Sequence, residues 1–130
     1  MTDAKPVRTG QPGGRPRLGN ERDYQRTIVG VAKDFGWRVH HTRAAQNAQG
    51  HYRTPIQGHA GFPDLVLVHR KVGVFFRELK VSTDLTEDQV LWGTALLDAG
   101  ANWAELRLPR DLDDVCQWLA DAPRKAAGIE

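Results

Sequence analysis

The sequence has very little cysteine and no long apolar run. Of its 130 residues only Cys116 is a cysteine, which excludes an internal disulfide and a zinc site built from several cysteines. Cys116 lies among Leu112, Val115 and Leu119 at helical spacing, so we expect it in the core. No segment approaches the roughly 20 apolar residues of a membrane-spanning helix, and the first residues lack the apolar stretch of a signal peptide. We therefore expect an intracellular, cytoplasmic protein.

Acidic residues are scarce in the middle of the chain. Residues 36–80 carry seven Lys and Arg against two acids, Asp64 and Glu78, whereas residues 81–130 carry four against ten. All five histidines also lie between positions 40 and 69. The net charge of +2 therefore hides a basic stretch with two isolated carboxylates. This pattern favours contact with a polyanion such as DNA, although ordinary charge fluctuation in a small protein is the alternative.

The length suits one domain with a single core. Residues 1–19 are rich in Gly, Pro and Arg, which indicates a disordered basic arm. Arg15 and Arg17 in this arm are candidate DNA contacts, because such arms add electrostatic attraction to a phosphate backbone. We expect the folded domain at 20–122 and a flexible tail at 123–130.

Hydrophobic periodicity predicts seven helices and strands. Asn20 caps the first helix and Gly36 ends it, while Thr86 and Gln89 form a capping box for the second. The expected elements are a helix at 21–35, strands at 37–42, 63–69 and 74–81, a helix at 87–99, a strand at 103–108 and a helix at 111–120. Three consecutive strands and a helical crossover to a fourth predict an α/β fold around a mixed sheet.

Two segments invite more specific expectations. The second helix is expected to bury Trp92, Ala95, Leu96 and Ala99.

Residues 43–62 show no periodicity, and irregular segments of this length are usually functional or mobile. We expect this segment to contact DNA, with a solvated loop as the alternative for each residue; the candidates are Arg43, His51, Arg53 and His59. The histidine spacings match no usual zinc pattern.

Asp64, Glu78 and Lys80 are the candidate catalytic residues. Glu78 and Lys80 are two apart on a strand and therefore share a face, while Leu79 faces the other way. Asp64 and Glu78 are each seven residues from Lys71 in the hairpin turn. They are therefore predicted to be neighbours across the two strands.

Two adjacent carboxylates repel each other, and a divalent cation relieves that repulsion. Asp64, Glu78 and the Leu79 backbone carbonyl form a typical partial shell for Mg²⁺ or Mn²⁺. Such a metal activates water and binds phosphate oxygens, and Lys80 can stabilise the charge that develops there. These residues predict phosphodiester hydrolysis. The alternative is a hairpin in which Lys80 only neutralises its acidic neighbours.

In the order and spacing of its motifs the sequence resembles the VRR-NUC family of the PD-(D/E)xK nuclease superfamily. The resemblance covers about residues 20–108 and rests on Glu21-x-x-x-Gln25, Gly61-x-Pro63-Asp64-Leu65, Glu78-Leu79-Lys80 and Thr86-x-x-Gln89-x-x-Trp92. It implies a restriction-endonuclease-like core, αβββαβ, and metal-dependent DNA cleavage by a homodimer. It also implies that Glu21 supports the metal centre and that Gln89 lies near it. Without the resemblance, Glu21 would be an ordinary first-turn acid. Gln89 could both cap its helix and reach the site only by swinging between the two.

Three functions remain open at this point. The first is an endonuclease selective for branched DNA, either a Holliday junction or a flap, which suits a two-fold enzyme. The second is a restriction-type or exonuclease activity on duplex DNA. The third is a catalytically silent DNA-binding module.

Overall fold

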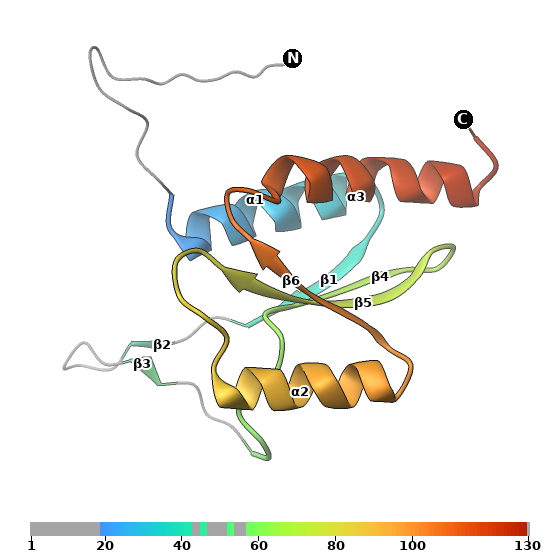
Figure 1. Cartoon of the computed structure of the whole chain (residues 1–130). Helices are drawn as coiled ribbons and strands as arrows, with labels where there is room; N and C mark the ends of the chain where they lie inside the picture. Colours follow the sequence, from blue (N-terminus) through green and yellow to red (C-terminus); the bar gives the residue numbers. More distant parts are fainter. Residues whose placement is uncertain (1–18, 43–44, 47–51, 54–56, 130) are drawn as a thin grey trace, which may run out of the picture.

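The computed structural model describes residues 19–42, 45–46, 52–53 and 57–129 (Figure 1). The described elements are α1 (Glu21–Asp34), β1 (Arg38–His41), β2 (Ala45–Gln46), β3 (Tyr52–Arg53), β4 (Leu65–His69), β5 (Gly73–Lys80), α2 (Glu87–Asp98), β6 (Asn102–Arg107) and α3 (Leu112–Ala126). Apart from the short β2–β3 pair, found in the segment expected to be irregular, this is the predicted order. The expectations on the basic arm with Arg15 and Arg17, and those on Arg43 and His51, lie outside the described residues.

The helix starts follow the predicted caps. The Asn20 side chain accepts a hydrogen bond from the Asp23 N–H at 2.9 Å, which satisfies one of the free N–H groups of the first turn of α1. At α2, Thr86 and Gln89 form the capping box in both directions. Local sequence therefore determines where both helices begin.

The four longer strands form one mixed sheet in the order β1-β4-β5-β6. β4 pairs antiparallel with both β1 and β5, and β6 runs parallel to β5 after the crossover through α2. In the β4–β5 hairpin Leu65 lies opposite Arg77 and His69 opposite Gly73. The α/β class and the mixed four-stranded sheet are confirmed.

The hydrophobic core lies on the face of the sheet that α1 and α3 cover (Figure 1). Leu65, Leu67 and Leu79 point into it from β4 and β5 and have no exposed surface. They meet Ile28 of α1 and Leu119 of α3, which are also fully buried. Each such side chain contributes about 1.5–3 kcal/mol relative to an exposed position. Cys116 lies half-buried against this core, near the position that its helical neighbours predicted.

α2 covers the opposite face of the sheet, and it packs less deeply than expected (Figure 1). Gly93 is the only buried residue of α2, and it packs so closely against β6 that a Cβ there would come within 2.7 Å of the Trp103 ring. Trp92 and Leu96 are half-buried, and the expectation that Ala95 and Ala99 are buried is wrong. The helix makes its closest approach through a residue without a side chain, so its flanking apolar residues stay partly exposed.

α3 continues to Ala126 rather than ending near Ala120, so the predicted helix end is wrong. Pro123 lacks an N–H and cannot bond to the carbonyl of Leu119, four residues earlier. The Trp37 indole N–H donates to that carbonyl instead, at 2.9 Å in the core. This long-range hydrogen bond satisfies the free carbonyl, while Ala122 packs against the core.

None of the helices in the described ranges is long and apolar enough to cross a membrane.

Candidate active site

Asp64 and Glu78 face each other at the open end of the β4–β5 hairpin. The register places Leu65 opposite Arg77, and one further step along both strands brings Asp64 opposite Glu78. Counting outward from the turn predicted this pairing, and the register confirms it. Asp64 itself lies in the bend just before β4, so its backbone is outside the ladder.

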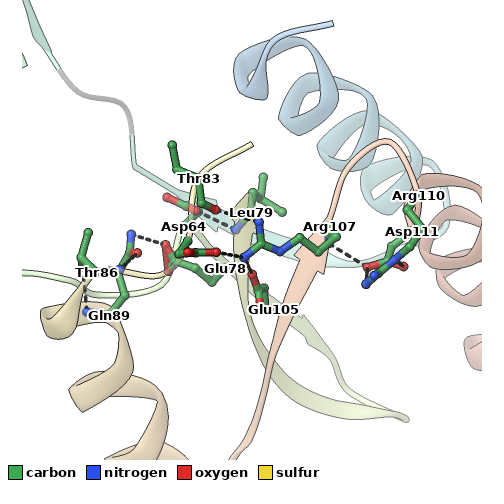
Figure 2. A network of polar contacts seen from close by, with 11 residues as sticks. Asp64, Glu78, Leu79, Thr83, Thr86, Gln89, Glu105, Arg107, Arg110 and Asp111 are labelled. Atoms are coloured by element: carbon green, nitrogen blue, oxygen red, sulfur yellow. Dashed lines mark hydrogen bonds and ion pairs between the residues drawn. The ribbon is translucent and has the colours of Figure 1, made fainter. Parts of the chain in front are cut away.

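Asp64 is fixed by the backbone of the neighbouring strand (Figure 2). Its Oδ2 accepts a hydrogen bond from the Leu79 N–H at 2.8 Å. In a β-strand the N–H and C=O of one residue point to the same side. The Leu79 carbonyl therefore also points to the side of Asp64, past the last ladder pair, Leu65 and Arg77. The carbonyl of Lys80 turns the other way and accepts from Leu108 N at 2.8 Å. The strand geometry thus directs one backbone oxygen toward the two carboxylates.

Glu78 is almost completely buried, with 1% of its surface exposed. Its Oε2 accepts a hydrogen bond from the Gln89 side chain at 2.7 Å, which Figure 2 shows reaching across from α2. Its Oε1 is also buried and has no hydrogen-bond donor among the described residues. A buried polar atom without a partner costs about 1–3 kcal/mol, and more when it carries charge. This oxygen is therefore a position where a proton or a cation would be favourable.

The electrostatics of the pair point the same way. The pKa of Glu78 is raised to about 9, mainly by burial and then by the adjacent Asp64 and Glu21, while Lys80 opposes the rise. Burial also raises the pKa of Asp64. Three contacts oppose this rise: the hydrogen bond from the Leu79 N–H, a side-chain hydrogen bond with Glu78 and the positive charge of Lys80. Without a bound cation the two carboxyl groups hold a proton at neutral pH. A divalent cation would take the place of that proton.

Lys80 of β5 and Glu21 of α1 complete the cluster. Lys80 shares the Glu78 face of β5 and is buried except for 8% of its surface. Glu21 begins α1, and partial burial together with the charge of Asp64 raises the pKa of its carboxyl, while Lys80 lowers it. Although Glu21 is distant in the sequence, it lies within the electrostatic range of Asp64, Glu78 and Lys80.

Gln89 performs both of its expected tasks at once. Its Oε1 accepts from the Thr86 N–H at 2.9 Å in the capping box, while its Nε2 donates to Glu78. The expectation that the side chain must swing between the two is wrong, because the amide presents an acceptor and a donor at opposite corners. One side chain therefore connects the start of α2 to the buried carboxylate.

The sequence reasoning missed Glu105 and Arg107 on β6. The parallel register places Glu105 beside Glu78 and Arg107 beside Lys80, on the same face of the sheet. Arg107 forms an ion pair with Glu105, and it donates a hydrogen bond to the Thr83 carbonyl at 2.7 Å. It thereby ties β6 to the loop that leads into α2 (Figure 2). The repeated pattern Glu-Leu-Lys and Glu-Leu-Arg was the available signal, but only a prediction of strand pairing could have used it.

Two of the predicted DNA contacts, His59 and Arg53, belong to the described part of the chain. His59 is exposed, and its backbone carbonyl accepts from the Trp92 indole at 3.2 Å. It lines a cavity of about 330 Å³ at the outer side of α2. Arg53 lies in β3, which pairs only with β2. Phe62 packs edge-on against Phe76 and Trp92, so it secures the loop before Asp64 to the sheet and to α2.

The donor set fits a hard divalent cation. In the described part of the chain no group of three or more His, Cys, Asp and Glu side chains is arranged to hold a metal ion. The expected shell, however, consists of two carboxylates and a backbone carbonyl. The Glu78 Oε1 is buried without a donor among the described residues, and the neighbouring Asp64 carboxylate is held by the Leu79 N–H. The strand geometry directs the Leu79 carbonyl to the same side, so the expected ligands are all oxygens. Oxygen donors of this kind suit Mg²⁺ or Mn²⁺, which keep several waters.

A comparison of the sequence with protein-family models finds no match, and a search of curated proteins finds none either. The resemblance to the VRR-NUC nucleases therefore stays a prediction that rests on the residues themselves.

Proposed function

We propose that this protein is a Mg²⁺- or Mn²⁺-dependent deoxyribonuclease with a restriction-endonuclease-like core. One observation carries the proposal. Glu78 is buried with one carboxylate oxygen lacking a donor among the described residues, directly beside Asp64 and Lys80. A hairpin that used its charges only for solubility would place them at the surface, where exposed ion pairs contribute little. Burial of this cluster instead favours a site that binds a cation.

Asp64, Glu78 and the Leu79 carbonyl would hold the cation, which supplies a water of lowered pKa and neutralises charge on the phosphate. During hydrolysis the water oxygen bonds to phosphorus, the bond to the leaving oxygen breaks, and the water loses a proton while the leaving oxygen gains one. Lys80 orients the attacking water and stabilises the negative charge on the phosphoryl oxygens. Gln89 and the Leu79 N–H keep the two carboxylates aimed at the site.

DNA with a branch is the substrate that we propose, either a Holliday junction or a flap, cut by a homodimer. In the sequence, the segment 36–80 that contains the two carboxylates carries a net positive charge, which favours a polyanionic substrate. A two-fold dimer presents two active sites to a two-fold junction. Restriction-type or exonuclease cleavage of linear duplex is the competing activity within the same chemistry.

The test uses labelled four-way junction, flap, linear duplex and single-stranded DNA with Mg²⁺ or Mn²⁺. We expect cleavage of at least one branched substrate, and a loss of at least roughly 10²-fold for Asp64→Asn and Lys80→Ala. Asp98→Asn, the same change at an exposed residue at the far end of α2, serves as the control and should cut at the wild-type rate.

Calorimetry separates the catalytic proposal from a silent module. Mn²⁺ should bind the wild type and Asp98→Asn, and should bind Asp64→Asn much more weakly. If no substrate is cut and Mn²⁺ releases no heat with the wild type, the nuclease proposal is wrong. DNA binding without cleavage or metal binding would instead favour a catalytically silent module.

A further inference from the structure

A groove of about 320 Å³ runs between α1 and the edge strand β1, and we call it the α1 groove. Its lining includes Arg22, Gln25, Arg26, Gly30 and Lys33 from α1, and His41 from β1. None of these residues belongs to the catalytic cluster or to the DNA contacts expected from the sequence. The volume is about ten times the share of one water molecule in the liquid, so the groove can admit a larger group.

The groove presents three cations in a line. A helix turns by about 100° per residue, so Arg22 and Lys33 lie about 20° apart around the axis and Arg26 about 40° from Arg22. Arg26 forms an exposed pair with Asp23 at 4.0 Å, which contributes little in water. No carboxylate is among the residues that line the groove. The three charges therefore form a positive stripe along one side of α1, about 16 Å from end to end.

Gly30 gives an independent sign that something approaches the helix here. Glycine in the interior of a helix destabilises it by roughly 0.5–1 kcal/mol relative to alanine. At Gly93 the packing against Trp103 explains the missing side chain, but a Cβ at Gly30 would meet nothing within 4 Å. The described part of the protein gives no internal reason for this glycine. Its place in the lining of the groove gives an external one, since it lets a ligand approach the helix backbone.

The groove begins beside the catalytic cluster. Gln25 follows Glu21 by one helical turn, so both lie on the same side of α1. At the other wall His41 pairs with Leu65, the residue after Asp64. The Thr42 N–H, one residue further, donates to the Asp64 carbonyl at 3.4 Å. The positive stripe therefore leads away from the carboxylates along the outer edge of the sheet.

We propose that the α1 groove binds the phosphodiester backbone of DNA next to the bond that is cut. This inference deepens the proposed nuclease function and rests on it. A linear array of three cations suits the negatively charged backbone of a nucleic acid strand, and its length corresponds to the rise of about five base pairs. Arg22, Arg26 and Lys33 neutralise the phosphates, while the open space at Gly30 lets the backbone approach the helix.

The first experiment measures binding rather than cleavage. Fluorescence anisotropy with a labelled four-way junction and with a duplex, in buffer containing EDTA, gives the dissociation constant over a range of salt. In the triple variant Arg22→Ala/Arg26→Ala/Lys33→Ala we expect the slope of log K against log salt to become shallower by roughly 2 to 3, about 0.9 for each phosphate that is no longer neutralised. The matched control, Arg70→Ala/Lys71→Ala/Arg124→Ala, removes three exposed charges elsewhere and should change the slope by less than the value for a single phosphate.

A second pair of variants acts at Gly30 without removing any charge. Gly30→Gln fills the groove, and Gly30→Glu fills it with the same shape and adds a negative charge. Neither should lower the unfolding midpoint, because the new Cβ meets open space and glycine is the poorer helix former. We expect Gly30→Gln to weaken DNA binding by about tenfold and Gly30→Glu to weaken it further.

Three outcomes separate this inference from the proposed function. Wild-type slopes for the triple variant and wild-type affinity for both Gly30 variants would overturn the groove proposal while leaving metal-dependent cleavage intact. Groove-dependent binding without cleavage in Mg²⁺ or Mn²⁺ would support the groove and overturn the nuclease. Equal weakening by the triple variant and its control would show that net charge alone attracts DNA, which also overturns the groove proposal.

Discussion

The two faces of the sheet differ in what they bury. On the face covered by α1 and α3, the side chains of Leu65, Leu67 and Leu79 have no exposed surface. On the face covered by α2, the buried residues of β5 are Glu78 and Lys80, and the apolar residues of the helix stay partly exposed, Leu91 to 61%. Leu79 and Glu78 are adjacent in the sequence and lie on opposite faces. The apolar face stabilises the fold, whereas the burial of charged groups on the other face lowers that stability.

The largest expected effect tests the stabilising face. Leu79→Ala should lower the free energy of unfolding by about 2–5 kcal/mol, because it leaves a cavity in the core. Leu91→Ala makes the same chemical change on the outer side of α2, and it should change that free energy by less than about 0.5 kcal/mol. Urea denaturation followed by tryptophan fluorescence measures both. Similar values for the two variants would mean that the faces do not differ as described.

The second prediction concerns the buried charge. The native pKa of Glu78, about 9, lies above its ordinary value of 4.5, so the native state binds this proton more tightly than the unfolded state does. The stability that this group contributes is fully present below pH 4.5. It falls as the pH rises from 4.5 to about 9, and it is lost above about pH 9. In metal-free buffer we expect the unfolding midpoint to fall from about pH 5 to about pH 9.

Glu78→Gln should remove most of that fall and stabilise the metal-free protein by on the order of 1–3 kcal/mol at about pH 8. Differential scanning calorimetry of the wild type and Glu78→Gln at several pH values, with EDTA present, measures the difference. Parallel pH profiles for the two proteins would show that Glu78 is charged and satisfied in the folded state.

The third prediction returns to the face covered by α1 and α3. Trp37→Phe keeps the aromatic ring but leaves the Leu119 carbonyl without a donor, so the free energy of unfolding should fall by about 1–2 kcal/mol. In Pro123→Ala the helix can supply its own N–H to that carbonyl. The destabilisation caused by Trp37→Phe should therefore be smaller in the Pro123→Ala background, which a double-mutant cycle measures. Additive effects would contradict this explanation of how Pro123 is tolerated.

The smallest expected change in stability separates the two tasks of Gln89. Gln89→Glu keeps an oxygen for the Thr86 N–H and replaces the donor to Glu78 by a second carboxylate. Gln89→Ala removes both side-chain hydrogen bonds but keeps the backbone N–H that donates to the Thr86 hydroxyl, so the free energy of unfolding should fall by about 1 kcal/mol. We expect Gln89→Glu to keep the helical start, measured by hydrogen exchange at the first turn of α2, and to lower cleavage at least as much as Gln89→Ala. Wild-type cleavage by both variants would remove Gln89 from the site.

The alternation of β5 and the hairpin count determined much of the candidate site from sequence alone. Glu78-Leu79-Lys80 assigns its residues to opposite faces, because the period of a strand is two. A hairpin has one fixed register once its turn is known, so Asp64 could be placed opposite Glu78. The capping residues of α1 and α2 were equally readable, because each cap is a contact between residues three apart.

Tertiary structure decided what depends on contacts between distant segments. The crossover through α2 brings Glu105 and Arg107 beside Glu78 and Lys80, and no local pattern specifies which strands pair in parallel. The contact between Gly93 and Trp103 determines where α2 comes closest to the sheet. Residues 20–35 have balanced charge in the sequence. Helical periodicity places Arg22, Arg26 and Lys33 on one side of α1. Only the packing of α1 against β1 makes that side a wall of the α1 groove, because the packing determines which side of the helix remains open.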